Sequence, residues 1–228
     1  MTQQRIAWWA ILLPMTAVVI WSLNIVVTRY VTDFIEPMSI SFYRWLLAWL
    51  LLTPFMLHKT WQQRQLIQQH SLKLAILSAF GMLLYQGLAY SAAHYTTATN
   101  MGLINAFIPI FTIFVGILIL KEFPNRYAVI GSIFSFLGLL YVLGQGQFNA
   151  ILNLGQHTGD LLMLLAVFFY AFYGVFLRKW QLALPLMLML YVQVCFALLY
   201  HVPIIVYFGL DPITQDNLLS VAYAGIFP

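Results

Sequence analysis

Apolar residues run along this chain in long stretches separated by short polar segments. Each stretch approaches the roughly 20 mostly apolar residues that a helix needs to cross a bilayer. An eighth stretch starts near Asn217 and reaches Pro228 before it is long enough to span. We therefore expect an all-α integral membrane protein with about eight visible helices and a truncated C-terminal end. The seven full-length predicted helices are Ala7–Tyr30, Met38–Leu57, Leu72–Ala93, Thr99–Leu120, Tyr127–Leu143, Asp160–Leu177 and Leu186–Gly209.

Lys and Arg residues are concentrated in the loops on one side of these predicted helices. The other side carries Arg29 together with acidic residues such as Asp33, Glu36 and Asp211. Cytoplasmic loops of membrane proteins are enriched in Lys and Arg. The pattern therefore predicts a cytoplasmic N-terminus. We also expect the protein to lie in the inner (cytoplasmic) membrane. The basic residues on the predicted cytoplasmic side are Arg5, Lys59, Arg64, Lys73, Lys121, Arg126, Arg178 and Lys179.

The two halves of the chain share a pattern of polar, aromatic and proline positions. Five predicted helices precede the longest polar loop, and because five is odd, the second half enters the membrane in the opposite sense. When the first two helices are laid on the sixth and seventh, unusual residues fall together. The matched pairs are Trp21 with Tyr170, Asn24 with Tyr173, Arg29 with Arg178, and Pro54 with Pro203.

This repeat predicts the domain organisation. We expect a first five-helix repeat over residues 1–145, an inter-repeat loop over 146–158, and a truncated second repeat over 159–228. Two complete inverted repeats would have ten transmembrane helices, so on the order of 60 further residues would complete the second one. We expect the chain to be inactive alone, because half of the second repeat's wall is missing.

The composition places the chain in lipid rather than in water. Hydrophobic residues make up 63% of it and charged residues only 7%, whereas soluble domains carry roughly 25% charged residues. The net charge of +4 comes mostly from the loop residues above, so we expect no nucleic-acid partner. The single cysteine, Cys195, lies in an apolar run and has no second cysteine for an internal disulfide.

Several short segments carry a resemblance to a known family. Their order and spacing together resemble the EamA-type transporters of the drug/metabolite transporter (DMT) superfamily, across the whole chain. One departure is Lys121, which stands where the family pattern has glycine. The segments are Trp21-Ser22-Leu23-Asn24, Tyr43-Arg44-Trp45, Asn105 to Pro109, Leu120-Lys121-Glu122, Gly159-Asp160 and Ala224 to Pro228.

The resemblance implies ten helices in two inverted repeats, with both termini in the cytoplasm and a substrate cavity between the repeats. It also implies a secondary transporter that exports amino acids, other small metabolites or drugs. The small metabolite and the lipid bilayer are the expected partners. We expect no metal and no cofactor.

Polar residues in the first and sixth predicted helices are candidates for opposite walls of that cavity. Trp21 and Asn24 lie on one face of the first helix, and the repeat matches them with Tyr170 and Tyr173 on the sixth. Each pair combines an aromatic ring with a hydrogen-bonding group. The alternative is that these groups only bond neighbouring helices.

The third and fourth predicted helices supply further candidates. Tyr85, Gln86 and Tyr90 form an uncharged stripe that could orient a polar metabolite, although an aromatic belt at the membrane interface explains Tyr90 equally well. Asn105 precedes Pro109, whose ring frees a backbone carbonyl in mid-span. Asn105 or a substrate could donate a hydrogen bond to that carbonyl. Pro109 itself could act as a hinge or could only improve packing.

Arg44 is the only charge that lies fully within a predicted helix. At a bilayer centre it would cost roughly 2.5–3.5 kcal/mol on insertion scales. We expect a structural or gating ion pair, with Asp33 or Glu36 as partner, in preference to substrate contact; reaching the outer headgroups is the alternative.

No Asp or Glu lies deep in a predicted helix, so protons are a coupling candidate only through a histidine or residues outside this chain. Membrane-embedded enzyme motifs, such as His-Glu-x-x-His or Gly-x-Ser-x-Gly, do not occur. An enzyme and a structural or channel protein are the alternatives to a transporter. Substrate, direction of transport, coupling ion and oligomeric state do not follow from the sequence.

Overall fold

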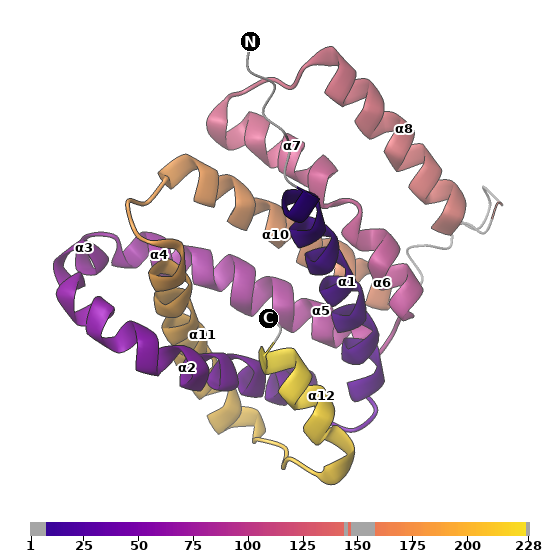
Figure 1. The fold of residues 1–228 in the computed structure, drawn as a ribbon. Coiled ribbons are helices and arrows are strands. Elements are labelled where there is room, and N and C mark those ends of the chain that lie inside the picture. The colour runs from indigo at the N-terminus through magenta and orange to yellow at the C-terminus, as the bar shows by residue number, and fades with distance from the viewer. Residues whose placement is uncertain (1–7, 144–145, 147–157, 227–228) are drawn as a thin grey trace.

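The computed structural model describes residues 8–143, 146 and 158–226, and this part of the chain is helical and contains no strand (Figure 1). The described helices are α1 (Trp8–Val31), α2 (Pro37–Gln62), α3 (Arg64–Gln69), α4 (Ser71–Ser78), η1 (Ala79–Leu84), α5 (Tyr85–Ala93), α6 (Ala98–Asn105), α7 (Ile108–Leu120), α8 (Arg126–Leu143), α10 (Thr158–Trp180), α11 (Leu186–Phe208) and α12 (Gln215–Ile226).

The prediction of an all-α membrane fold is confirmed. Five helical segments of the described chain are long and apolar enough to cross a membrane, and α1 and α8 contribute shorter apolar stretches. Each predicted helix has a counterpart, with ends that differ by a few residues. The largest difference is at the end of α2, which continues past Leu57 to Gln62 because no helix-breaking residue follows Pro54.

The fourth predicted helix is two helices, α6 and α7. Pro109 lies in the first turn of α7, where its missing N–H leaves no hydrogen bond unmade. Just before it the chain makes two short-range turns, since Ala106 N–H donates to Leu103 O (3.1 Å) and Phe107 N–H donates to Ile104 O (2.9 Å). Pro109 therefore begins a helix instead of interrupting one in mid-span, and its role as a hinge stays a prediction.

The third predicted helix is continuous but contains one π-helical stretch, η1, between α4 and α5. Such wider turns occur frequently at functional sites. The indole N–H of Trp45 on α2 donates to the backbone carbonyl of Met82 in η1 at 3.1 Å. This bond ties the π-helical stretch to α2.

Small residues bring α10 against α5 and the turn after it. Ala92 and Ala93 on α5 and Ala166 on α10 are fully buried in one cluster. Side chains this small allow two helix backbones to approach closely, as is common in membranes. Gly159 lies at such a close approach, where an added Cβ would come within 2.6 Å of the backbone of Tyr95.

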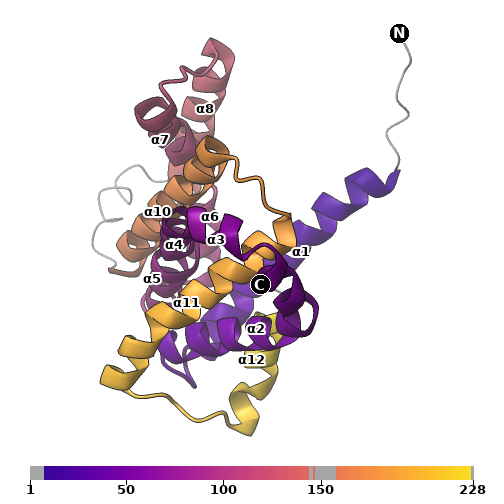
Figure 2. The ribbon, with the colours of Figure 1, turned by 90° about the vertical axis from the view of Figure 1, so that its left-hand side faces the viewer.

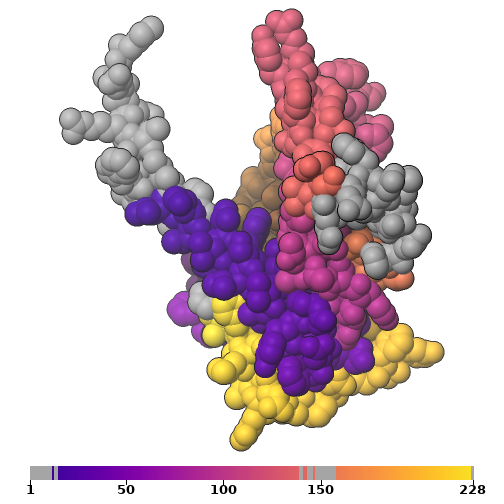
Figure 3. Space-filling view, turned by 90° about the vertical axis from the view of Figure 1, so that its right-hand side faces the viewer, coloured from indigo at the N-terminus to yellow at the C-terminus, as the bar shows by residue number. Residues whose placement is uncertain are grey.

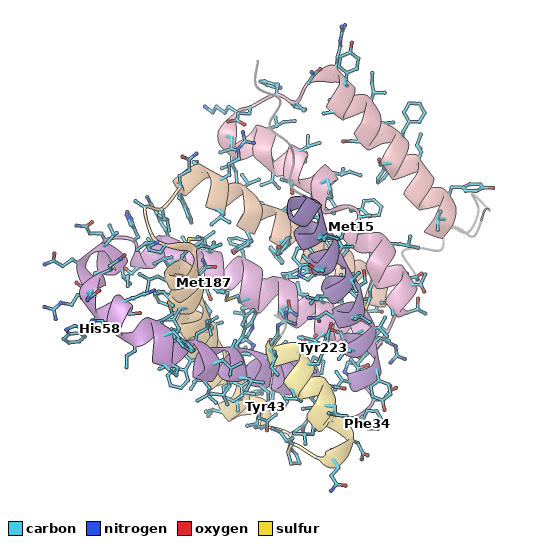
Figure 4. The ribbon with its side chains drawn as sticks, in the orientation of Figure 1. Met15, Phe34, Tyr43, His58, Met187 and Tyr223 are labelled. Carbon is cyan, nitrogen blue, oxygen red and sulfur yellow. The ribbon has the colours of Figure 1, made fainter. Side chains whose placement is uncertain are left out.

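Polar contacts join loops at both ends of the bundle. At one end, the carboxylate of Asp211, in the α11–α12 loop, accepts from the backbone N–H of Glu36 at 2.7 Å. At the other end, Arg178 on α10 forms an ion pair with Glu122 after α7 at 2.7 Å. The Tyr43 hydroxyl, near the start of α2, donates to the carbonyl of Asp211 at 2.6 Å. Figure 4 shows His58 near the other end of the same helix.

Two helices lie at the margin of the bundle. α8 packs only lightly against α6 and α7 and stands apart in Figure 1. The N-terminal part of α1 leans away from the other helices in Figure 2, where Met15 and Val18 are exposed. Exposed apolar side chains on such helices suit a lipid environment.

Some expectations fall outside the described residues. Residues 147–157 of the expected inter-repeat loop 146–158 lie outside them, whereas Gly146 and Thr158 are described. Arg5 and the last two residues, Phe227 and Pro228, are also outside.

Candidate functional site

A cavity of about 660 Å³ lies among α1, α2, the η1–α5 segment, α6 and α10. Figure 3 shows the molecule hollowed between the indigo α1 and the magenta segments that include α6. Ligand-binding sites of small molecules commonly have volumes of roughly 300–1,000 Å³. The lining includes Trp21, Asn24, Arg44, Trp45, Gly81, Met82, Tyr85, Gln86, Asn105, Tyr170 and Tyr173.

The structure brings most of the predicted site residues to this one cavity. Seven of the eight candidates line it, and the eighth, Tyr90, does not. Tyr90 has no exposed surface, so it lies inside the bundle and not in an aromatic belt. Trp21 is 57% exposed and stands at the margin, whereas Asn24 is only 8% exposed. Pro109 is absent from the lining, which its neighbour Ile108 reaches.

Three tyrosines form an aromatic wall across α5 and α10. The ring centroids of Tyr85 and Tyr170 are 4.6 Å apart, and those of Tyr170 and Tyr173 are 5.6 Å apart. The Tyr85 hydroxyl donates to Asn105 Oδ1 at 3.3 Å, so Asn105 bonds a neighbouring helix. This wall offers flat apolar surface together with hydroxyl groups.

The aromatic wall is held in place by the π-helical stretch. Gly81 packs directly on the ring of Tyr173, and a Cβ there would lie 2.8 Å from a ring carbon. Trp45 fixes the adjacent residue Met82 through its carbonyl. The backbone of η1 thereby sets how far Tyr173 reaches into the cavity.

Arg44 forms the polar side of the cavity. Its Nη1 donates to Asn24 Oδ1 at 3.3 Å and to the Tyr90 hydroxyl at 3.2 Å. The guanidinium also lies over the Trp45 ring, 5.3 Å from its centroid. Among the described lining residues Arg44 is the only charged one.

The expected ion pair of Arg44 with Asp33 or Glu36 is wrong. Asp33, in the turn after α1, pairs with Arg29 of α1 at 3.2 Å. Glu36 is exposed at the α1–α2 turn. Arg44 is 5% exposed, so its side chain lies inside the bundle and does not extend along the outer surface of α2. The spacing along the sequence could not separate these outcomes, because the acceptors of Arg44 come from two other helices, Asn24 on α1 and Tyr90 on α5.

Asp160 is a buried carboxylate whose environment the sequence did not reveal. It is 1% exposed, and its Oδ1 accepts from the Thr96 hydroxyl at 2.5 Å and from Asn100 at 3.4 Å. The sequence could predict only that Asp160 lies in the first turn of a helix, where a carboxylate is favourable. The fold adds the α5–α6 turn, which covers it. No group of three His, Cys, Asp or Glu side chains suited to a metal occurs in the described ranges.

These features define a class: a multi-pass helical membrane protein that encloses a ligand-sized cavity between its helices. The family model for the EamA-like transporter family matches residues 8–144 and 157–228. The chain therefore belongs to the EamA-like transporter family.

Individual relatives are also named as transporters. The uncharacterized transporter YyaM of Bacillus subtilis is 25% identical over 151 residues, covering 66% of this chain and 50% of that protein. An uncharacterized transporter of Archaeoglobus fulgidus is 26% identical over 168 residues, covering 72% of this chain and 55% of that protein. This chain thus spans about half the length of these relatives. No solved structure matches it.

Proposed function

We propose that the protein is a secondary transporter of the DMT superfamily that moves a small metabolite or drug across the cytoplasmic membrane by alternating access. The observation that carries this proposal is the cavity of about 660 Å³ among the helices of a chain whose relatives are named transporters. Its role is transport and not catalysis. Following the resemblance of its motifs, we propose export, with amino acids among the candidate substrates.

The packing of the helices supports two inverted repeats. If α1, α2 and the continuous α4–η1–α5 helix correspond to α10, α11 and α12, a twofold relation predicts which helices touch. It pairs α2 with α11, and it requires the contact of α4–η1–α5 with α10 to be matched by a contact of α1 with α12. All three contacts occur, and Figure 4 shows Tyr223 of α12 beside α1, whose Ile20 carbonyl accepts from it at 3.0 Å.

This arrangement supports the proposal of alternating access. The first repeat supplies Trp21, Asn24 and Tyr85 to the cavity, and the second repeat supplies Tyr170 and Tyr173. Rocking of one repeat against the other would change the access to a site that contacts both. We propose these side chains, with Gln86 and Asn105, as the substrate-binding set.

Flux through the full-length protein in proteoliposomes tests the transport proposal. A screen of labelled metabolites should find at least one that is carried, and Asn24→Ala and Trp21→Ala should each reduce its flux by tenfold or more. Trp61→Ala is the matched control, because Trp61 is 69% exposed at the end of α2, away from the cavity. Unchanged flux in both cavity variants, or no flux of any metabolite, would refute the proposal.

Accessibility labelling tests the proposed orientation. Single cysteines replacing Lys59 and Asp211, in a Cys195→Ser background, should react from opposite sides of the membrane. Lys59 should be cytoplasmic. Labelling of both from one side would rule out the inverted repeat.

A further inference from the structure

Arg44 is a buried cation that has no carboxylate partner among the described residues. Only 5% of its surface is exposed, and it lines the cavity. Its two hydrogen-bond acceptors, Asn24 and Tyr90, are both neutral. A charge in this position is costly unless an opposite charge or several hydrogen bonds compensate for it.

The hydrogen bonds leave one edge of the guanidinium unused. Both of them use Nη1, and the buried Nε has no hydrogen-bond partner within the described part of the chain. Nε and Nη2 together form the edge that binds a carboxylate through two parallel hydrogen bonds. Nε has almost no accessible surface in this structure, so an oxyanion in the cavity would meet this edge once the guanidinium turns toward it, and it would then satisfy a donor that the described residues leave without a partner.

No acidic residue of the described chain is placed to take that role. The lining contains no Asp or Glu. Four carboxylates have partners elsewhere: Asp33 on Arg29, Glu122 on Arg178, Asp160 on Thr96, and Asp211 on the Glu36 backbone. The other two, Glu36 and Asp216, are exposed.

We propose that this cavity binds a small organic carboxylate, with its carboxylate on the Nε–Nη2 edge of Arg44 and its apolar body against Tyr85, Tyr170 and Tyr173. The proposal rests on the proposed transport function and names its substrate class. An uncharged amide would lose the charge-assisted hydrogen bonds. A simple amine would bring a second cation beside Arg44, with no carboxylate in the lining to pair with it.

Three ligands with one body and different head groups test the inference. 3-Phenylpropanoate, 3-phenylpropanamide and 3-phenylpropylamine are titrated into the full-length protein in lipid nanodiscs. The acid should bind at least tenfold more tightly than the amide, and the amine should bind no better than the amide. Equal binding of acid and amide, or no binding of any of the three, would overturn the inference.

Variants separate charge recognition from a structural role. Arg44→Gln should reduce acid binding to the level of the amide, and Arg44→Lys should keep part of the preference because it keeps the charge. If Arg44 were only structural, Arg44→Gln would lower thermal stability and leave the ratio of acid to amide affinity unchanged.

Two further substitutions keep the test valid if Arg44→Gln fails to fold. Asn24→Asp places a carboxylate where Nη1 already donates, so the internal ion pair should abolish the preference for the acid while Arg44 is still present. Tyr90→Phe removes one neutral hydrogen bond and keeps the charge, so the preference should survive. The opposite results for these two variants would contradict the inference.

Flux measurements distinguish this inference from the transport proposal. Transport of the amide or amine as fast as the acid would refute carboxylate recognition and leave the transporter in place. Arg44-dependent binding of the acid without flux of any compound would support carboxylate recognition and refute transport.

Discussion

Gly159→Ala should weaken the contact that joins the start of α10 to the turn after α5. A Cβ at this position would lie 2.6 Å from the carbonyl carbon of Tyr95 and 2.8 Å from both the Ala92 oxygen and the Thr96 nitrogen. Ordinary contacts begin near 3.4 Å, so the overlap is 3.4 − 2.6 = 0.8 Å. Backbone atoms cannot rotate away as a side chain does, so one of the two helices must move.

The size of the effect follows from this overlap. Overpacking in a filled interior costs about 1–3 kcal/mol, and contact with three backbone atoms places this substitution near the upper end, at about 3 kcal/mol. Gly174→Ala in the same helix is the matched control, because no atom lies within 4 Å of its added Cβ. There the higher helix propensity of alanine stabilises by up to about 1 kcal/mol.

Thermal melting of the purified full-length protein in one detergent, followed by tryptophan fluorescence, measures both variants. Gly159→Ala should lower the melting midpoint, whereas Gly174→Ala should leave it unchanged or raise it. If Gly159→Ala melts with the wild type, or if both substitutions shift the midpoint equally, the close approach of α10 to the α5–α6 turn is refuted.

Other substitutions test the walls of the cavity and the ends of the bundle. Trp45→Phe should destabilise by about 1–3 kcal/mol in the same melting assay, because it leaves the carbonyl of Met82 without the indole N–H at 3.1 Å. Gly81→Ala should displace the Tyr173 ring, which lies 2.8 Å from the added Cβ, and so reduce ligand affinity more than stability. Titration of the phenylpropanoid ligands checks this, and unchanged affinity would contradict it. Glu122→Gln removes an exposed ion pair and should change stability by less than about 1 kcal/mol; a larger loss in the melting midpoint would contradict that estimate.

The sequence by itself determined the helices and where they lie along the chain. Apolar runs of membrane-spanning length leave the backbone one way to satisfy its hydrogen bonds in lipid, which is the helix. For the same reason, polar residues within those runs stood out, and Asn24, Tyr85 and Tyr173 could be selected as cavity candidates before any contact was known.

Only the tertiary structure decided what these residues touch. Helical periodicity specifies the face on which Arg44 lies, but its partners depend on how α2 meets α1 and α5, which brings Asn24 and Tyr90 to its Nη1. The π-helical stretch at Gly81 and the burial of Asp160 likewise come from packing between distant segments. Apolar helices pack together in many ways with similar energies, so the side-chain partners in the interior follow from the complete arrangement and not from any one segment.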